Sequence, residues 1–421
     1  MIALMLALAV SAAGSNALSA AGSNALSAAG PGTPVDAGAR VDAGVRDRWD
    51  GGCQGSVVCL DDGGVRRLVI RTEDASLKAA PTLTLAAAGD VTLGYHFEQY
   101  FDLRLDGGTW ADAGPSPAQT REQLLDYPFA KVKKVLARAD IAVANLECPF
   151  TDRGEKIAKN FNFRASPGLA AALPPSGVDV VTLANNHLMD YGPDGVRDTL
   201  AALNAQHIAH FGAGMNLAQA RKPAIVKRHG EKVAFLGYLY IGNPPIEPLV
   251  VWAQKNKPGV AGAGGDLQAL LAMVKEDVAA AKKKAQVVVV FFHFGREAHH
   301  EIQPYQATLA HAAVDDGADL VLGSHPHVLQ GAERYKGVPI VYSLGNFVFG
   351  GNANPRNKES AIFEATLRGT QVTHTHFVPV QITSVPEAPF QPFVLHGRAG
   401  KRVLDHLVDY SKAFPEPLVG P

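Results

Sequence analysis

The chain has 421 residues, with 39 basic and 40 acidic side chains and a formal net charge of -1 at pH 7. This balance lacks the excess of Lys and Arg that nucleic-acid binders use to displace counterions from phosphates, so we expect no nucleic-acid partner. Apolar residues form 47% of the chain. That share suffices for a sizeable core, in one large domain or two average ones, and excludes disorder throughout.

The first 13 residues, MIALMLALAVSAA, resemble the core of a signal peptide because they are apolar and precede small residues, although no Lys or Arg comes before them. Since roughly 20 apolar residues are needed to span a bilayer, we expect cleavage and export, with this leader as the only route to a membrane. A misplaced start codon is the alternative. The expected location is extracytoplasmic, in the periplasm or at the cell surface. There Cys53 and Cys59 could form a disulfide, and Cys148 would stay unpaired.

Composition divides the chain into four parts. Residues 1–48 combine the leader with a low-complexity linker, in which SAAGSNAL occurs twice and VDAGAR is followed directly by VDAGVR. Residues 49–80 hold two strand-like pieces around the turn signal DDGG and form a small appendage of unknown purpose. We expect the main domain at 81–385 and a C-terminal extension, packed on it, at 386–421.

From residue 81 on, apolar strand-like runs alternate with stretches whose apolar residues repeat at helical spacing, which predicts an α/β fold. Several runs are apolar on both faces, so both faces must be covered. The expected strands are LTLAAAG from Leu83, IAVANL from Ile141, VDVVTLA from Val178, VAFLGYLY from Val233, VVVVFFHF from Val287, ADLVLGS from Ala318, IVYSLGNF from Ile340 and one more after Thr373. The expected helices are 129–139, 194–204, 267–284 capped by Asp266, 305–316 ended by Gly317, and a closing helix at 401–413.

Nearly every one of these strands ends in a residue that can bind a metal ion or move a proton. In open α/β sheets, ligands bind at the carboxyl ends of the strands, so we expect these side chains to converge although they are far apart in the chain. They are Asp90, Glu147, Asn185, Asn186, His187, His293, His325, His327 and Asn346.

Carboxylates, an amide oxygen and neutral imidazoles together suit a borderline divalent ion such as Mn²⁺, Zn²⁺ or Fe²⁺, whereas a Ca²⁺ site would be rich in oxygen and lack histidines. A bridging carboxylate can hold two such ions about 3.5–4 Å apart and lower the pKa of a shared water. The residue types therefore predict one or two divalent ions.

His325-Pro326-His327 is the most specific of these patterns. In an extended segment, residues two apart point to the same side, so both imidazoles could reach one centre. His299 and His300 lie in a polar stretch and are expected in a solvated loop.

The other candidates have plain structural alternatives. Asp90 could start a turn after its strand. Asn185 and Asn186 could satisfy loop backbone, and the neighbouring His187 could be a core imidazole bonded to a carbonyl. Cys148 has no obvious general-base partner, so we expect a small buried thiol rather than a nucleophile.

Six ordered segments resemble the CapA (poly-gamma-glutamate capsule synthesis) family of the calcineurin-like metallophosphoesterase superfamily. They are GDVTLG from Gly89, NLECPFTDRG from Asn145, LANNHLMDYGPDGVRDTLAAL from Leu183, HFGREA from His293, GADLVLGSHPHVLQGAERYKGVPIVYSLGNFVF from Gly317, and the spacing of Pro304 and Gln306 between the last two. The resemblance runs from about residue 81 to 379, and six ordered motifs over that length leave little room for chance.

The resemblance implies a four-layer α-β-β-α sandwich of the metallophosphoesterase type, in which helices flank two central sheets. It also implies a proton donor at His187. The implied metal ligands are Asp90, Glu147, Asn186, His293, His325 and His327. The residues expected to contact substrate or to support the ligands are Asn145, Asn185, Glu297 and Asn346.

Two positions depart from the catalytic members of that superfamily, whose first motif is usually Asp-x-His and whose bridging residue is a second Asp. Thr92 stands at the His position, so one ligand is missing unless His96 or another group replaces it. The bridging position is Glu147, whose side chain is longer by one methylene. One bound ion and two bound ions are therefore both open.

The resemblance leaves two functions to separate. A metal-dependent hydrolase would direct a metal-activated water at a phosphoester or an amide, with His187 protonating the leaving group. The alternative is a non-catalytic extracytoplasmic accessory that binds or helps export an anionic polymer of the poly-gamma-glutamate type. The expected partners are thus a phosphoester substrate or an anionic polymer, together with other capsule synthesis proteins.

Overall fold

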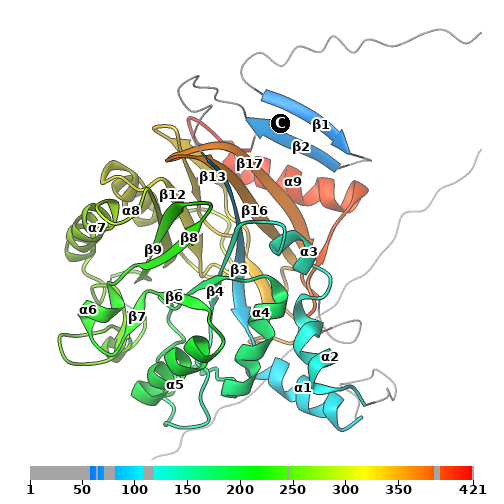
Figure 1. Ribbon diagram of the computed structural model, residues 1–421, viewed down its shortest axis with the longest axis vertical. Coiled ribbons are helices and arrows are strands. Elements are labelled where there is room, and N and C mark those ends of the chain that lie inside the picture. Colours follow the sequence, from blue (N-terminus) through cyan, green and yellow to red (C-terminus); the bar gives the residue numbers. More distant parts are fainter. Residues whose placement is uncertain are drawn as a thin grey trace, which may run out of the picture. The chain divides into compact units, whose positions relative to one another are not determined.

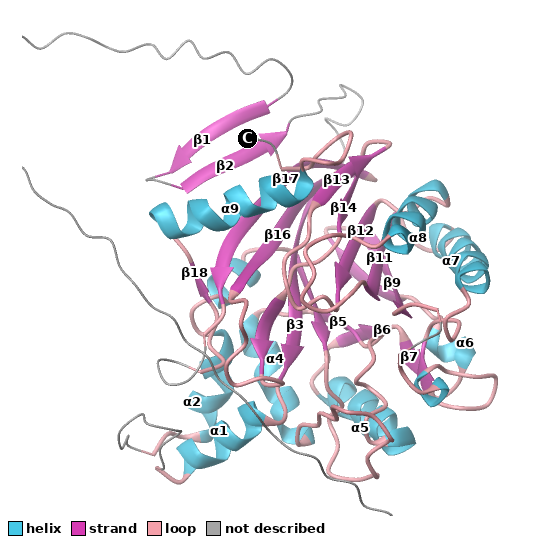
Figure 2. Ribbon diagram, turned by 180° about the vertical axis from the view of Figure 1, so that it is seen from behind, coloured by secondary structure: helices cyan, strands magenta, loops and turns pink. Residues whose placement is uncertain are grey.

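Two large β-sheets with helices beside them form most of the described chain (Figures 1 and 2). The computed structural model describes residues 57–62, 65–70, 81–107, 118–243, 246–383 and 389–419. The expected leader and linker at 1–48, and Cys53 with its expected disulfide, lie outside the described residues. Within the described residues, no helix is both long enough and apolar enough to cross a membrane.

The larger sheet has eight strands and a parallel centre. From β3 through β4 and β5 to β6 each strand runs parallel to its neighbour, and β15 also pairs with β3 in parallel. On the other side of β3, the pairs that lead through β16 and β17 to β18 are antiparallel. In spatial order the strands are β18 (Phe393–Val394), β17 (Gln371–Gln381), β16 (Glu359–Arg368), β3 (Thr82–Thr92), β4 (Ile141–Leu146), β5 (Val180–Thr182) and β6 (Ala209–Phe211), with β15 (Asn346–Phe349) beside β3.

The second sheet has six strands, of which the central ones are also parallel. The pairs from β9 through β11 and β12 to β14 are parallel, and both edge strands are antiparallel. In spatial order the strands are β13 (Ala332–Tyr335), β14 (Val338–Val341), β12 (Leu320–Ser324), β11 (Val287–Phe294), β9 (Glu231–Tyr240) and β8 (Ala224–Arg228). Two further pairs stand apart: β7 (Ala213–Gly214) with β10 (Gly259–Val260), and β1 (Val57–Asp62) with β2 (Val65–Ile70).

Strand β11 shows why several runs are apolar at every position. Val287, Val289 and Phe291 belong to an apolar cluster that also holds residues of the eight-stranded sheet. The alternate residues Val288 and Val290 belong to a second cluster, which includes side chains of α7 (Leu267–Lys282) and α8 (Pro304–Asp315). Since side chains alternate between the faces of a strand, both faces of β11 are covered by protein, which requires an unbroken apolar run.

The helices begin and end where local chemistry favours it. Helix α7 starts at the cap Asp266, whose carboxylate accepts a hydrogen bond from the backbone N–H of Ala269 at 3.0 Å. Helix α8 has Pro304 at its start and is followed by Gly317, which has a φ of 110°. The remaining helices are α1 (His96–Leu105), α2 (Arg121–Asp126), α3 (Lys133–Leu136), α4 (Leu173–Ser176), α5 (Gly192–Ala205), α6 (Leu217–Ala220) and α9 (Gly397–Ser411), with 3₁₀ turns at Tyr127–Phe129, Pro167–Ala172 and Leu249–Val251.

Two expected elements differ from the structure. The run IVYSLGNF is not one strand, because residues 342–345 lie between β14 and β15, which belong to different sheets. The Ser343 hydroxyl donates to the backbone carbonyl of Val328, and Gly345 has a φ of 69°. Asn346 therefore begins a strand instead of ending one.

The helix expected at 129–139 is also wrong. The structure has the 3₁₀ turn Tyr127–Phe129 and the single helical turn α3, and between them Val132 leaves the helical region with a φ of -122°. The two strand-like pieces of the appendage form the antiparallel hairpin of β1 and β2. The α/β class is confirmed, whereas the domain boundaries at 80 and 385 stay predictions.

Candidate metal centre

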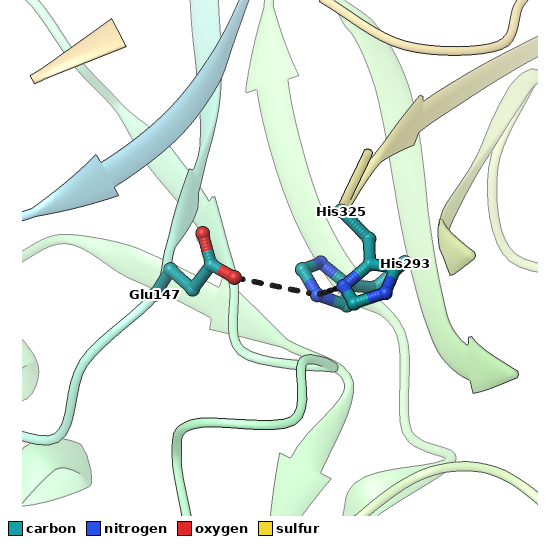
Figure 3. Close-up of side chains that lie close together, drawn as sticks. All are labelled: Glu147, His293 and His325. Atoms are coloured by element: carbon teal, nitrogen blue, oxygen red, sulfur yellow. Dashed lines mark hydrogen bonds and ion pairs between the residues drawn. The ribbon is translucent and has the colours of Figure 1, made fainter. Parts of the chain in front are cut away.

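Side chains from both sheets meet at the carboxyl ends of their parallel strands. Glu147 directly follows β4, His293 lies near the end of β11, and His325 directly follows β12. Figure 3 shows these three side chains pointing toward one another. Asp90 lies inside β3, two residues before its end, and not after the strand as expected.

The first of two groups of possible ligands, here called the Asn186 group, consists of Glu147, Asn186, His293 and His325. Nε2 of His293 lies 2.9 Å from Oδ1 of Asn186 and 3.1 Å from Nδ1 of His325. The same nitrogen lies 3.5 Å from Oε1 of Glu147. All four residues are buried. Two oxygens and two nitrogens thus face one another at the distances expected around a shared cation.

The second group, here called the Asp90 group, consists of Asp90, Glu147 and His327. Nδ1 of His327 lies 3.2 Å from Oδ2 of Asp90, and its Nε2 lies 3.8 Å from Oε1 of Glu147. One possible ligand atom from each residue lies within 4.8 Å of the other two. Glu147 belongs to both groups, which is the geometry of a bridging carboxylate.

Three buried carboxylate oxygens at this centre accept no hydrogen bond: both oxygens of Glu147 and Oδ2 of Asp90. The 3.2 Å approach of His327 to Asp90 is an ion-pair distance without hydrogen-bond geometry. Burying a carboxylate without partners costs several kcal/mol, roughly, unless a cation compensates it. The donor set therefore fits one or two divalent cations.

Burial and like charge shift the pKa values in the Asn186 group in opposite directions, raising that of the carboxyl and lowering those of the imidazoles. Burial, followed by the charge of Asp90, raises the pKa of Glu147 well above its usual range. Burial also lowers the pKa of His293 and of His325 well below 6.5, with neighbouring histidines adding to the effect. Both imidazoles are therefore neutral at pH 7, as metal ligands must be.

His327 shows the opposite shift. Burial lowers its pKa, but the negative charges of Glu147 and Asp90 outweigh burial and raise the pKa to about 10. Its side chain keeps 19% exposure, while the two carboxylates are fully buried. The Asp90 group therefore attracts positive charge strongly, either as a proton on His327 or as a metal ion.

Three asparagines hold the ligands in place. Asn145 donates to Oδ1 of Asp90 at 2.8 Å, and Asn185 donates to the amide oxygen of Asn145 at 3.0 Å. Oδ1 of Asn346 lies 2.9 Å from Nδ1 of His327. A hydrogen bond at Nδ1 fixes the imidazole orientation and directs Nε2 at Glu147, whereas the role of Asn346 as a supporting residue stays a prediction.

The segment His325-Pro326-His327 is not extended. The prediction that an extended backbone points both imidazoles to one side is therefore wrong. His325 has a φ of 98° and His327 a φ of 58°, both in the left-handed region. Such backbone costs about 1–3 kcal/mol per residue and is found where function requires it. The turn places the two imidazole centroids 5.9 Å apart, which brings them to the same centre.

Thr92, at the position of the missing further ligand of the Asp90 group, donates its hydroxyl to the backbone carbonyl of Glu147 at 3.4 Å. His96 does not replace it: Nδ1 of His96 lies 3.2 Å from the side chain of Gln99, and His96 belongs to none of the possible ligand groups among the described residues. Glu297 is exposed and lies near the histidine pair, within 4.8 Å of a nitrogen of each.

His187 lies beside the centre and is oriented by a carboxylate. Its Nδ1 donates to Oδ2 of Asp190 at 2.7 Å, and its ring stacks on Phe163 with centroids 4.2 Å apart. Burial lowers the pKa of His187 although the charge of Asp190 opposes the shift. With Nδ1 engaged, Nε2 is the atom that can exchange a proton with a ligand.

A cavity of about 970 Å³ opens next to these residues. Asn186, His187 and His325 line it together with both cationic and anionic side chains, among them Arg296 and Glu297. Cys148, in contrast, is buried and does not line the cavity, and burial raises the pKa of its thiol. The expectation of a buried thiol is confirmed.

The family model of the bacterial capsule synthesis protein PGA_cap matches residues 84–351. The chain belongs to this family. It is 32% identical to the capsule biosynthesis protein CapA of Bacillus anthracis, over 71% of this chain and 67% of that protein. It is 34% identical to the PGA biosynthesis protein CapA of Bacillus subtilis (strain 168), over 64% of this chain and 69% of that protein. A probable polyglutamine synthesis accessory protein of Mycobacterium tuberculosis is 31% identical, over 53% of this chain and 59% of that protein.

Three residues beside the metal centre were not predicted from the sequence: Lys159, Asp190 and Glu247. Asp190 follows His187 at the i+3 position, so a search for carboxylates near each candidate histidine would have found it. Lys159 and Glu247 lie outside the helices and strands, in segments without periodicity. Nothing in the local sequence distinguishes them from solvated loop residues.

Proposed function

We propose that this protein is a metal-dependent hydrolase of capsule or exopolymer biosynthesis, of the poly-gamma-glutamate type, which acts on a phosphoester or an amide. The observation that carries the proposal is the set of buried carboxylate oxygens of Asp90 and Glu147, which accept no hydrogen bond and face imidazoles and an amide oxygen. The names of the Bacillus relatives support the biological setting.

One or two divalent ions, Mn²⁺, Zn²⁺ or Fe²⁺, would polarise the substrate and activate a water molecule. The Asn186 group and the Asp90 group would hold them. The cavity beside the two groups would bind the substrate, with Glu297 near its reacting end, while Asn145 would hold Asp90 in place. His187 would transfer a proton at Nε2, because Asp190 already occupies Nδ1.

The proposal extends to the fold and the location. A four-layer α-β-β-α sandwich is supported by three apolar clusters: one holds side chains of both large sheets, one holds the six-stranded sheet with helices, and one holds mainly the eight-stranded sheet with helices. Figure 1 draws α7 and α8 beside the six-stranded sheet. Export to the periplasm or cell surface is supported by the apolar leader at 1–13 alone.

A second candidate is an extracytoplasmic accessory that binds an anionic polymer without cleaving it, with other capsule synthesis proteins as partners. The engaged hydroxyl of Thr92 favours it, because the Asp90 group then has three ligands. The name of the Mycobacterium relative points the same way. Binding of poly-gamma-glutamate by purified protein, without turnover of any phosphoester or amide, would favour this candidate.

The substitution His187→Ala tests the hydrolase directly. Loss of a general acid or base lowers turnover by about 100-fold or more, whereas the bound metal should stay, because His187 belongs to neither ligand group. Turnover of a panel of phosphoesters and amides and the metal content by elemental analysis are the measurements. His229→Ala, at an exposed histidine outside the cavity, is the matched control. Equal turnover of His187→Ala and wild type on every hydrolysed substrate would contradict the mechanism.

A further inference from the structure

A lysine with a buried side chain contacts two acidic residues and one asparagine beside the centre. The side chain of Lys159 is 7% exposed, and its Nζ lies 2.9 Å from Oδ1 of Asp190 and 3.2 Å from Oε2 of Glu247. These are ion-pair distances without hydrogen-bond geometry. The same Nζ donates to the backbone carbonyl of Asn186 at 2.8 Å. The side chains of Asp190 and Glu247 are 0% and 9% exposed, so little of the three charged side chains is exposed to solvent.

One arm of this network fixes the amide of Asn186. Its Nδ2 donates to Oε1 of Glu247 at 3.0 Å, and its Oδ1 faces His293 at 2.9 Å. An amide can present its oxygen to a cation only if its NH₂ group finds an acceptor elsewhere. Glu247 is that acceptor, and a rotated amide would direct two N–H groups at the centre instead.

The other arm fixes the imidazole of His187. Asp190 accepts from Nδ1 of His187 at 2.7 Å and from the backbone N–H of Phe163 at 2.6 Å. The ring is thereby held against Phe163, with Nε2 available on the cavity side. Lys159 supplies the positive charge that both buried carboxylates require, because an unpaired buried carboxylate is strongly unfavourable.

We propose that Lys159, through Glu247 and Asp190, is a positioning residue that aligns the metal ligand Asn186 and the proton-transfer residue His187 at the same time. The inference rests on the proposed function, since it assigns these two residues their roles there. The three charged residues come from separate parts of the chain, so the network also joins the segments that carry them. Both Lys159 and Glu247 line the cavity, beside the exposed side chains of Phe161 and Ile246.

The test compares Lys159→Met, which keeps the length of the side chain and removes its charge, with Lys156→Met, an exposed lysine of the same segment. We expect Lys159→Met to weaken Mn²⁺ binding, measured by titration calorimetry, by about 10- to 100-fold, the usual effect of removing a residue that orients a metal ligand. The visible absorption spectrum of the Co²⁺ protein should change as well, because it reports the ligand geometry. Lys159→Arg should restore most of both signals, and Lys156→Met should match wild type.

Two further variants separate the arms. Glu247→Ala should weaken Mn²⁺ binding as Lys159→Met does, while Asp190→Asn should leave it within about twofold, because Asp190 acts on His187 and not on a ligand. If the network only stabilised the fold, Glu247→Ala and Asp190→Asn would change the Mn²⁺ affinity by the same factor. If Lys159→Met fails to fold, as judged by near-ultraviolet circular dichroism, these two variants still decide the question.

Unchanged Mn²⁺ affinity and an unchanged Co²⁺ spectrum in both Lys159→Met and Glu247→Ala would overturn the inference. If wild type itself binds neither Mn²⁺ nor Co²⁺, the metal proposal fails, and crystal structures of the variants then test the positioning separately. In Lys159→Met, and not in Lys156→Met, the Asn186 amide should rotate and the His187 ring should leave Phe163. Side chains that stay in place would refute the role of Lys159.

Discussion

The Asn186 group and the Asp90 group share Glu147 but differ in completeness and in charge. The Asn186 group offers four buried ligands, two of them imidazoles whose pKa burial holds well below 6.5. The Asp90 group offers three, and its imidazole, His327, has a pKa raised to about 10. A cation can enter the first group without displacing a proton from an imidazole, whereas in the second it competes with the proton on His327. We infer that the Asn186 group would bind a divalent ion more tightly than the Asp90 group.

Replacement of the shared ligand is expected to have the largest effect. Glu147→Ala should remove metal from both groups, so the metal content of purified protein should fall to near zero. Metal content by elemental analysis after equilibration with Mn²⁺ is the measurement, with Glu301→Gln, at an exposed glutamate, as control. A variant that keeps one full equivalent would show that the two groups do not share Glu147.

The pH dependence of the metal-free protein gives an effect of intermediate size. Folding raises the pKa of His327 from 6.5 to about 10 and also raises the pKa of Glu147. Both side chains therefore bind a proton more tightly in the folded state than in the unfolded state. The stabilisation from His327 is complete below pH 6.5 and is lost as the pH rises through about 10. We expect the urea midpoint of EDTA-treated protein to fall over this range, and His327→Gln to flatten the fall. A midpoint that rises with pH in wild type would contradict the charge balance assigned to the Asp90 group.

The smallest expected effect comes from a residue that supports one group only. Asn346→Ala removes the hydrogen bond at Nδ1 of His327 and should weaken the lower-affinity Mn²⁺ site by about tenfold. The higher-affinity site should be unchanged, because Asn346 makes no contact with the Asn186 group among the contacts of the described residues. Two-site analysis of calorimetric titrations separates the two affinities. Equal weakening of both sites would mean that the groups are not independent.

The sequence predicted most of the sheet strands because their apolar runs are long and uninterrupted. The bounds of β4 and β11 match the expected runs residue for residue. Because ligands gather at the carboxyl ends of parallel strands, the sequence alone predicted that Glu147 and His293 lie at one centre. Short elements such as α3, β7 and β10 depend on tertiary contacts and carry no periodic signal of their own.

What local pattern could not supply is backbone geometry and long-range charge pairing. His325 and His327 have left-handed φ values in the segment after β12, and a histidine in the sequence does not predict such a backbone conformation. Lys159 contacts Asp190, which is 31 positions further along the chain, and Glu247, which is 88 positions further along. Such pairs become visible only when the fold is known.

The centre draws its acidic ligands from the eight-stranded sheet and its imidazoles from the six-stranded sheet. Neither sheet can therefore offer a complete site before the two have docked. By mass action, an ion that binds only the docked state raises the population of that state as the ion concentration rises. The amount of correctly assembled protein would thus follow the supply of divalent metal in its surroundings.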